Sequence, residues 1–421
     1  MAAALVLFAA AVAAHATQAA IHPEWYWQQT DESVYRAAGV AIRTHQGMLY
    51  SVRLGAPALP FTYPPFAALL FAVASPFSFA SWQIALAATS IMALPVIAYQ
   101  SLGLAGLERG SARLAAAFAL AAVSLWLEPV QKTLLFGQLN LLLLAVIMAD
   151  LAAPRRHRWK GAGIGIAAGI KLTPLIFIPY LLLTGRRRAA LVALVTFGVT
   201  AALGLILLPA DSVAYWGGKF AAPGDGPERL VNQSIDGLVQ RAMHDGTSAL
   251  AVWLVLAALT FTGGLVTAAV ASRRGWELPG IVVCAVTGLL ISPISWTHHW
   301  VYVIPGLALL ASRAPQPPAI DRATAGHPAG SSAVAGAGRM ATGVIVVGLF
   351  AMWPARSGPD GYYDPRAALV PRGLLRFAPH NFGLEYRWHG LELLLGNYYV
   401  LTGAIFVIVT AGYLALTRKQ A

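Results

Sequence analysis

Two adjacent carboxylates, Asp31 and Glu32, follow the first apolar run of this 421-residue chain. Only 11% of the residues are charged, so an acidic pair beside an apolar segment is a candidate for chemistry. A carboxylate in this place is able to act as a general base that takes the proton of a hydroxyl group. Two alternatives stay open. Asp31 caps the start of a helix, which is compatible with base chemistry, or Glu32, about 100° around the same helix, is the base.

Basic side chains in apolar surroundings form the second group of candidates. Lys171 lies in the apolar segment Lys171-Leu172-Thr173-Pro174, where an ammonium group suits a phosphate or a carboxylate. His298 and His299 are adjacent and begin another apolar run, and a protonatable ring nitrogen there suits a phosphate. Lys132 is interpreted as a side chain that extends to the membrane interface.

No metal or cofactor site is expected from the sequence. Neighbouring histidines on a helix point in different directions, and no HxxxH pattern or Cys/Asp cluster supports them. The single cysteine, Cys284, lies in an apolar run, so no disulfide framework is expected. A phosphate-binding loop and a dinucleotide-binding glycine motif are also absent from the sequence.

Two short amide-rich clusters are candidates for binding a sugar. Gln138 and Asn140 occur in Phe136-Gly137-Gln138-Leu139-Asn140, and Asn232 and Gln233 precede Ser234. Amide groups donate and accept hydrogen bonds together, as sugar hydroxyls require. Ordinary turn and capping chemistry is the alternative for both clusters.

Composition indicates an all-α integral membrane protein that crosses the bilayer many times. Hydrophobic residues make up 58% of the chain, the mean hydropathy is +0.65, and apolar windows recur along most of its length. The formal net charge is +12, but the Lys and Arg residues cluster between apolar runs. That pattern is typical of positive-inside topology signals, so nucleic acid is excluded as a partner and membrane lipids are expected.

The chain is predicted to form a single domain, 1–421, with about twelve spans. Residues 1–21 form the first span, or alternatively a cleaved signal peptide. Residues 22–60 form an outer loop that carries a short amphipathic helix on the membrane surface. Residues 210–246 and 357–394 are further outer loops, and 313–338 is an inner linker. The remaining apolar runs lie near 61–79 (re-entrant or surface-lying), 82–102, 112–127, 138–152, 189–209, 247–271, 278–292, 297–312, 339–356 and 395–416.

One segment is too short to cross the bilayer twice. It lies between two basic clusters, residues 154–160 and 186–188, which are expected on the same side. Two helices of about 12 residues reach only about 18 Å each, well short of the roughly 30 Å hydrocarbon core. The segment is therefore predicted to enter and return, with Lys171 at the turn and at membrane depth.

Several of these motifs, in this order, resemble glycosyltransferase family 87 of the GT-C superfamily. The resemblance spans roughly residues 25–305. Its motifs are Asp31-x-x-Val34-Tyr35, Leu49-Tyr50, Leu59-Pro60-Phe61-Thr62-Tyr63-Pro64-Pro65-Phe66-Ala67, Phe136-Gly137-Gln138-x-Asn140, Lys171-x-x-Pro174, Asn232-Gln233-Ser234 and Ser292-Pro293-x-Ser295-Trp296-x-His298-His299-Trp300.

The resemblance implies an inverting glycosyltransferase with a GT-C fold in the plasma membrane of an actinobacterial cell envelope, its active site on the outer face. The implied sugar donor is polyprenyl-phosphate-mannose, and the implied acceptor is a mannosylated lipid, phosphatidylinositol mannoside or lipomannan/lipoarabinomannan, with an α-1,2 linkage formed. Asp31 matches the catalytic residue, and Lys171, His298 and His299 are expected at the donor phosphate. The residues expected at the sugar or acceptor are Tyr35, Tyr63, Gln138, Asn140, Asn232, Gln233 and Trp296.

Two alternatives to mannosyl transfer remain. A related branch of enzymes transfers arabinofuranose from decaprenyl-phosphate arabinose, which changes only the sugar donor. A transporter or flippase for a lipid-linked sugar also contains broken helices and charges at membrane depth.

Overall fold

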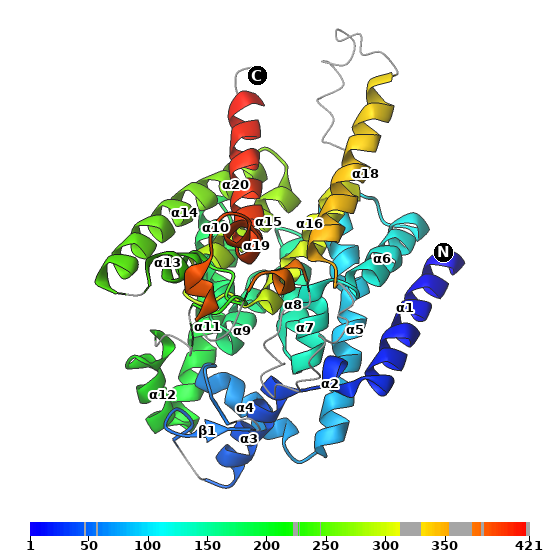
Figure 1. Cartoon of the computed structure of the whole chain (residues 1–421). Coiled ribbons are helices and arrows are strands. Elements are labelled where there is room, and N and C mark those ends of the chain that lie inside the picture. Colours follow the sequence, from blue (N-terminus) through cyan, green and yellow to red (C-terminus); the bar gives the residue numbers. More distant parts are fainter. Residues whose placement is uncertain are drawn as a thin grey trace.

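The computed structural model of the chain is predominantly helical (Figure 1). It describes residues 1–45, 48–55, 58–221, 226, 228–244, 246–311, 330–352, 373–379 and 383–417. Most of the predicted linker 313–338 and the first part of the predicted loop 357–394 lie outside these ranges. The expectation of an all-α membrane protein is confirmed at the level of secondary structure and apolar helices.

The predicted amphipathic helix is present as α3 (Thr30–Arg43), after α1 (Ala2–Ile21) and α2 (Pro23–Tyr26). It is not merely a surface helix, because its buried face packs against α4 (Pro65–Ala74). Gly39 allows this approach, since a Cβ there would overlap the backbone of Phe71. The Tyr35 and Phe71 rings stack with centroids 4.6 Å apart. A small antiparallel ribbon, β1 (Arg53–Leu54) and β2 (Leu59–Pro60), joins the two helices.

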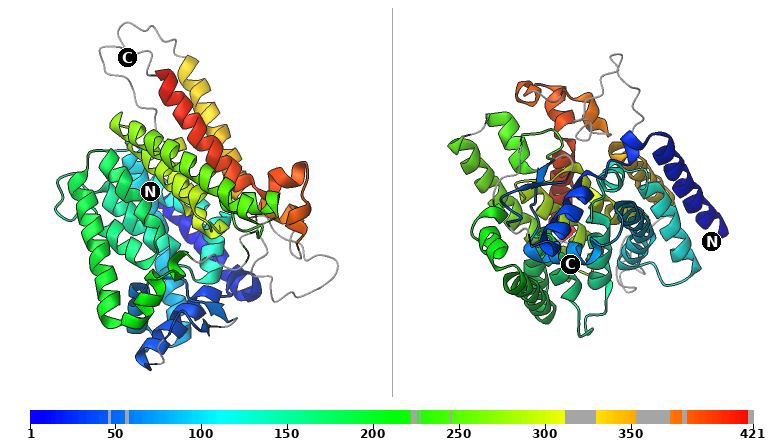
Figure 2. Two further views of the ribbon diagram at one scale, coloured as in Figure 1. Left: turned by 90° about the vertical axis from the view of Figure 1, so that its left-hand side faces the viewer. Right: turned by 90° about the horizontal axis from the view of Figure 1, so that it is seen from below.

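α3, α4 and the β ribbon lie at one end of the molecule, together with α12 (Pro209–Trp216), as Figure 1 shows. The opposite end carries the free ends of α18 (Gly330–Phe350) and α20 (Tyr398–Thr417), as Figures 1 and 2 show. The start of α3 is tied to α7 (Glu128–Phe136), because Gln28 N and Gln29 N both donate to Leu135 O, at 3.1 and 2.7 Å. The position of Asp31, two residues on, is therefore set by α7.

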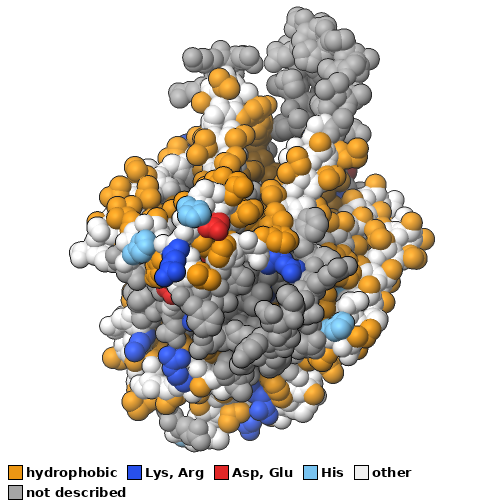
Figure 3. Space-filling model, in the orientation of Figure 1, with side chains coloured by type: hydrophobic (Ala, Val, Ile, Leu, Met, Phe, Trp, Pro, Cys, Tyr) orange, Lys and Arg blue, Asp and Glu red, His pale blue; other side chains and the backbone are white. Residues whose placement is uncertain are grey.

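Five helices in the described ranges are long and apolar enough to cross a membrane, or up to six if one bent pair counts as a span. The five are α1, α5 (Phe79–Leu104), α11 (Arg187–Leu207), α14 (Thr247–Arg273) and α20. The bent pair is α7 with α8 (Asn140–Ala152), at 119°. Apolar side chains dominate the outer surface of many helices (Figure 3).

The expected number of about twelve spans is not confirmed. Several predicted apolar runs form helices of 15 residues or fewer, which reach at most about 22 Å. These helices are α6 (Ser111–Ser124), α15 (Glu277–Ile291) and α16 (Val303–Ala311), the last preceded by the 3₁₀ helix η3 (Thr297–Tyr302). They contribute to the buried core together with α5 and α8.

The predicted hairpin between the basic clusters is confirmed. Its limbs are α9 (Ala162–Ile170) and the 3₁₀ helix η1 (Thr173–Ile176) with α10 (Phe177–Leu183). Gly161, just before α9, and Gly165 and Gly169 within it fit against Ala189, Ala193 and Thr200 of α11 in that order, since a Cβ at each would overlap its neighbour. Because α9 and α11 thus run in parallel, the chain must turn back between them, and Lys171 lies at the turn.

Short helices occupy the predicted outer loops. The segment 210–246 contains most of α12, the 3₁₀ turn η2 (Lys219–Ala221) and α13 (Ile235–Met243). The described part of 357–394 contains η5 (Leu374–Phe377), η6 (Leu384–Arg387) and the start of α19 (Leu391–Gly396). An isolated bridge between Asn232 and Trp296 connects the first of these loops to η3.

Candidate active site

Asp31 lies in the first turn of α3, where Gln138 determines the orientation of its carboxylate. Gln138 Nε2 donates to Asp31 Oδ2 at 2.7 Å. The amide reaches this point because α7 ends at Gly137, in the left-handed conformation (φ +66°), and the chain bends before α8 begins at Asn140. The N-cap residue, Gln29, makes no side-chain cap hydrogen bond, and Asp31 lies in the first turn, where its charge also complements the helix dipole.

Two tyrosines hold Gln138 in a single orientation. Tyr35 and Tyr63 donate to Gln138 Oε1 at 2.9 and 3.0 Å, and their hydroxyl oxygens are 2.6 Å apart. Because the amide oxygen accepts from both phenols, the amide nitrogen must face Asp31. The two tyrosines therefore act on the carboxylate through Gln138, which is a different contact from the direct sugar contact expected from the sequence.

A cationic centre adjoins this carboxylate network. Lys171 Nζ lies 3.0 Å from Asn140 Oδ1 and 3.0 Å from His299 Nε2, and 5.9 Å from the centroid of the Tyr63 ring. Asn140 Nδ2 donates in turn to the backbone oxygen of His298 at 2.8 Å. Residues far apart in the sequence, from α3, the α7–α8 bend, the α9 turn and η3, thus meet in one place.

The two histidines keep unused ring nitrogens. An ammonium group only donates, so His299 Nε2 accepts from Lys171 and a neutral His299 ring carries its proton on Nδ1. His299 Nδ1 and His298 Nε2 are buried and have no hydrogen-bond partner in the part of the chain that the structure describes. Both nitrogens are available for a polar ligand.

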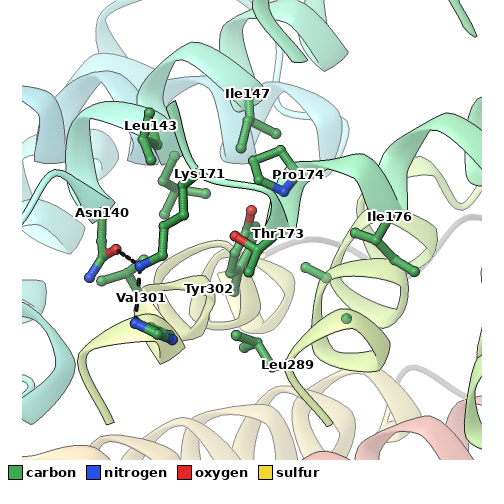
Figure 4. A pocket seen from close by; sticks show the side chains of 14 residues that line it. Asn140, Leu143, Ile147, Lys171, Thr173, Pro174, Ile176, Leu289, Val301 and Tyr302 are labelled. Atoms are coloured by element: carbon green, nitrogen blue, oxygen red, sulfur yellow. Dashed lines mark hydrogen bonds between the residues drawn. The ribbon is translucent and has the colours of Figure 1, made fainter. Parts of the chain in front are cut away.

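An apolar pocket extends from the cationic centre (Figure 4). Its cavity volume is about 40 Å³, and the empty space rises to about 480 Å³ when the open side is included, between α8, the α9 turn, α15 and η3. Lys171 and Asn140 point toward one another at one end, with His299 as the second partner of Lys171. The remaining lining is mostly apolar and includes Leu143, Leu144, Ile147, Pro174, Ile176, Ala285, Leu289, Val301 and Tyr302. One polar end and a long apolar lining suit an amphiphilic ligand with a charged head group.

Asp31 and its neighbour Glu32 differ in the pKa of their carboxyl groups. Burial raises the pKa of Asp31 from 3.8 to about 6, although the Gln138 hydrogen bond and the positive charge of Lys171 both lower it. Asp31 is therefore mostly ionised at pH 7. Burial also raises the pKa of both Tyr35 and Tyr63, so their phenols stay protonated and keep donating to Gln138.

Glu32 has the properties of a buried neutral acid. Its side chain is fully buried, neither oxygen has a hydrogen-bond partner among the described residues, and burial raises its pKa to about 8. Its carboxyl group lies near Gly137, where a Cβ would overlap both Gln29 and Glu32. A carboxyl group that is protonated at pH 7 is a poor general base, which favours Asp31 over Glu32.

The second amide cluster lies apart from this pocket. Asn232 Nδ2 donates to Pro293 O at 3.1 Å, and its Oδ1 accepts from Ser295 N at 2.9 Å. Gln233 Nε2 donates to Leu230 O and Gly396 O, both at 2.7 Å. Both side chains are fully buried and connect backbone segments through these hydrogen bonds, and the sugar contact expected of them stays a prediction. Trp296 is half-buried and pairs through its backbone with Asn232.

Lys132 differs from its sequence interpretation. It is 1% exposed and its Nζ lies 5.1 Å from the centroid of the Phe136 ring, so it does not extend to an interface.

The apolar lining of the pocket could not be identified from the sequence, because residues such as Leu143 and Leu289 look like ordinary core residues. Within the described ranges, no three His, Cys, Asp or Glu side chains gather as a metal site would require.

Comparison with known proteins gives one family match. The sequence profile described as glycosyltransferase family 87 matches residues 61–293, which include Tyr63, Gln138, Asn140 and Lys171. No solved structure gives a significant match.

Three curated mycobacterial relatives resemble the chain. One from Mycobacterium tuberculosis, named polyprenol-phosphate-mannose-dependent alpha-(1-2)-phosphatidylinositol mannoside mannosyltransferase, is 32% identical over 280 residues, covering 63% of this chain and 64% of the relative. A second from that organism, named for phosphatidylinositol pentamannoside, is 35% identical over 289 residues, covering 65% and 64%. A Mycolicibacterium smegmatis protein of that second name is 35% identical over 260 residues, covering 59% and 60%. The chain thus matches less than two thirds of the length of each relative.

Proposed function

Because this chain belongs to glycosyltransferase family 87, whose profile matches residues 61–293, we propose that it transfers a mannosyl group from polyprenyl-phosphate-mannose to a lipid-linked acceptor. The names of the relatives support both substrates, since they specify a polyprenol-phosphate-mannose donor and a phosphatidylinositol mannoside acceptor. They also support an α-1,2 linkage in the product.

The observation that carries the proposal is a carboxylate centre beside a cationic centre, which itself lies at one end of an apolar pocket. Glycosyl transfer needs a base for the attacking hydroxyl and a positive environment for the departing phosphate. Asp31 supplies the first, and Lys171 with Asn140 and His299 supplies the second. The Tyr63 ring, which bonds Gln138 through its hydroxyl, lies beside Lys171 and connects the two.

In the proposed reaction, an acceptor hydroxyl oxygen attacks C1 of the mannosyl group from the face opposite the phosphate. The bond from C1 to the phosphate oxygen breaks, and its electron pair stays with that oxygen. The hydroxyl proton passes to Asp31. One displacement inverts the configuration, so a β-linked sugar donor gives an α-linked product, through an oxocarbenium-like transition state.

The hydrogen bonds at Asp31 determine which of its oxygens is the base. Oδ2 is occupied by Gln138 Nε2, so Oδ1 is left to accept the proton. Gln138, Tyr35 and Tyr63 are positioning residues, since they act on the acceptor through Asp31. The general base contributes about 10²–10⁴-fold to the rate.

The polyprenyl chain of the sugar donor is proposed to lie along the apolar pocket that leads away from Lys171. In the transition state, negative charge grows on the departing phosphate, and the ammonium group of Lys171 stabilises it. His299 Nδ1, which carries the proton of the neutral ring, is a buried donor available to another phosphate oxygen.

We further propose that the protein is a single GT-C domain of the plasma membrane, with the Asp31 end on the outer face. The arginine clusters at 154–160 and 186–188 support this orientation, because α9 ends at the Lys171 turn and begins beside those clusters.

The test is sugar transfer by the purified protein in detergent or nanodiscs. Polyprenyl-phosphate-[¹⁴C]mannose and a phosphatidylinositol mannoside acceptor should give a labelled glycolipid with an α-1,2 linkage. Decaprenyl-phosphate-[¹⁴C]arabinose serves as the competing sugar donor in the same preparation. Transfer of arabinose alone would indicate an arabinosyltransferase. Movement of the intact lipid-linked mannose between leaflets without transfer would indicate a flippase.

A further inference from the structure

A second cavity lies at the far end of α5 from Asp31. It contains about 660 Å³ of empty space, which includes its open mouth, between the end of α5, the start of α6 and the end of α8. Its polar lining consists of Gln100, Arg109 and Arg113, with Tyr99, Gly103 and Ala152 among the other residues. No acidic residue lines it.

Arg113 is built into the wall of this cavity. It is 8% exposed, its Nε donates to Tyr99 O at 2.9 Å, and its guanidinium carbon lies 3.9 Å from the centroid of the Tyr99 ring. Gly103 makes room for the guanidinium group, because a Cβ there would overlap it. The group is therefore fixed before any ligand binds, while Nη2 has no hydrogen-bond partner in the described part of the chain.

The charge around Arg113 is incompletely balanced by the protein. Tyr99 O and Leu107 O accept from it, but these are neutral carbonyl groups. The carboxylate of Asp150, near the end of α8, is occupied by the backbone N–H groups of Gly161 and Ile164, at 2.6 and 3.0 Å. Arg109 adds a second, exposed cation, and α6 begins at Ser111 without a side-chain cap. Two guanidinium groups and a free helix start favour an anion.

The length and composition of α5 make it a candidate membrane span, which puts the cavity at one end of that span. α5 has 26 residues, a length of about 39 Å, which exceeds the roughly 30 Å hydrocarbon core. Its first residue, Phe79, lies under the Arg36 side chain of α3, so the cavity at its other end is at the opposite surface. A phospholipid head group of that leaflet is therefore within reach of the two arginines.

We propose that this cavity binds the phosphate group of an anionic phospholipid, held between Arg109 and Arg113. An arginine fork fits two phosphate oxygens, and Gln100 is placed to donate to the head group. The site is separate from the sugar-transfer site and does not depend on the function proposed for it.

The experiment measures lipid binding by native mass spectrometry of the detergent-solubilised full chain. Dioleoylphosphatidylglycerol, dioleoylphosphatidylcholine and inorganic phosphate are titrated separately. Arg109→Gln removes one cation of the cavity at an exposed position, so folding should be retained. Arg188→Gln is the matched control, because Arg188 is also exposed and lies near the start of α11, outside the cavity lining.

The expected result is tighter binding of phosphatidylglycerol than of phosphatidylcholine, weakened about tenfold by Arg109→Gln and unchanged by Arg188→Gln. Equal binding of both lipids, or equal phosphatidylglycerol binding by the two variants, would overturn the proposal. Binding of inorganic phosphate without binding of phosphatidylglycerol would overturn the proposal that the ligand is a lipid.

Discussion

Replacing Gln138 by leucine tests how the protein sets the basicity of Asp31. The change keeps a side chain of similar size but removes the amide that donates to Asp31 Oδ2 at 2.7 Å. This hydrogen bond stabilises the ionised carboxylate, so its loss raises the pKa of Asp31 above about 6. The two phenols that bonded Gln138 Oε1 are already 2.6 Å apart and can pair with each other.

The size of the shift follows from the strength of the bond. A hydrogen bond to a charged group contributes about 1.5–3 kcal/mol, and one pKa unit corresponds to about 1.4 kcal/mol. The pKa of Asp31 is therefore expected to rise by about 1–2 units in Gln138→Leu. A base must be ionised to act, so activity is lost as the pH falls through this pKa, and the loss begins at a higher pH in the variant.

The assay is the pH dependence of kcat/KM for mannosyl transfer, which reports the pKa of the free enzyme. The acidic limb of the wild-type profile is expected near pH 6, and that of Gln138→Leu about 1–2 units higher, with most of the activity regained at pH 9. Gln83→Leu near the start of α5 is the matched control and should keep the wild-type profile. An unmoved acidic limb in Gln138→Leu, or an equal shift in the control, would refute the reasoning.

Three further predictions concern phosphate binding and stability. Lys171→Met should raise KM for the sugar donor by about 10–100-fold, because the cation that binds the phosphate is lost. The control Lys219→Met, at an exposed position, should leave KM unchanged. Initial rates measured against donor concentration check both expectations. Gly137→Ala should destabilise the fold by more than about 1 kcal/mol, since φ is +66° and a Cβ would overlap Glu32, while Gly198→Ala, with open space around it, should be neutral or stabilising in thermal unfolding. Glu277→Gln should lower the free energy of unfolding of the purified protein by at most about 3–5 kcal/mol, because it leaves the buried Arg186 without its ion-pair partner. A thermal unfolding midpoint equal to that of the wild type would contradict this.

The sequence predicted the local elements of the site well. A short amphipathic helix was predicted within residues 22–60, and α3 is that helix, with Val34, Tyr35 and Ala38 on its buried face. The basic clusters on either side of Lys171 predicted the hairpin, because charge restricts both of its ends to one side of the membrane. These features depend on short-range patterns that a single sequence contains.

Features that depend on tertiary contacts were not predictable in this way. The bend between α7 and α8 turns Gln138 toward Asp31, and nothing in Phe136–Asn140 indicates its angle. The hydrogen bonds of Asn232 and Gln233 to the backbone of Pro293, Ser295 and Gly396 could not be predicted either, because those residues lie far away in the sequence. The number of about twelve spans is not confirmed, because an apolar run shows that a helix is buried or in lipid, whereas its length relative to the bilayer depends on packing.

The central claim is that Asp31, and not its neighbour Glu32, is the base for sugar transfer. The most direct measurement compares kcat for mannosyl transfer in two isosteric variants, Asp31→Asn and Glu32→Gln, each checked for folding by its thermal unfolding midpoint. Asp31→Asn is expected to lower kcat by at least about 10², and Glu32→Gln to stay close to the wild type, because Glu32 is already neutral at pH 7. Near-normal transfer by folded Asp31→Asn, together with loss of transfer in Glu32→Gln, would contradict the account.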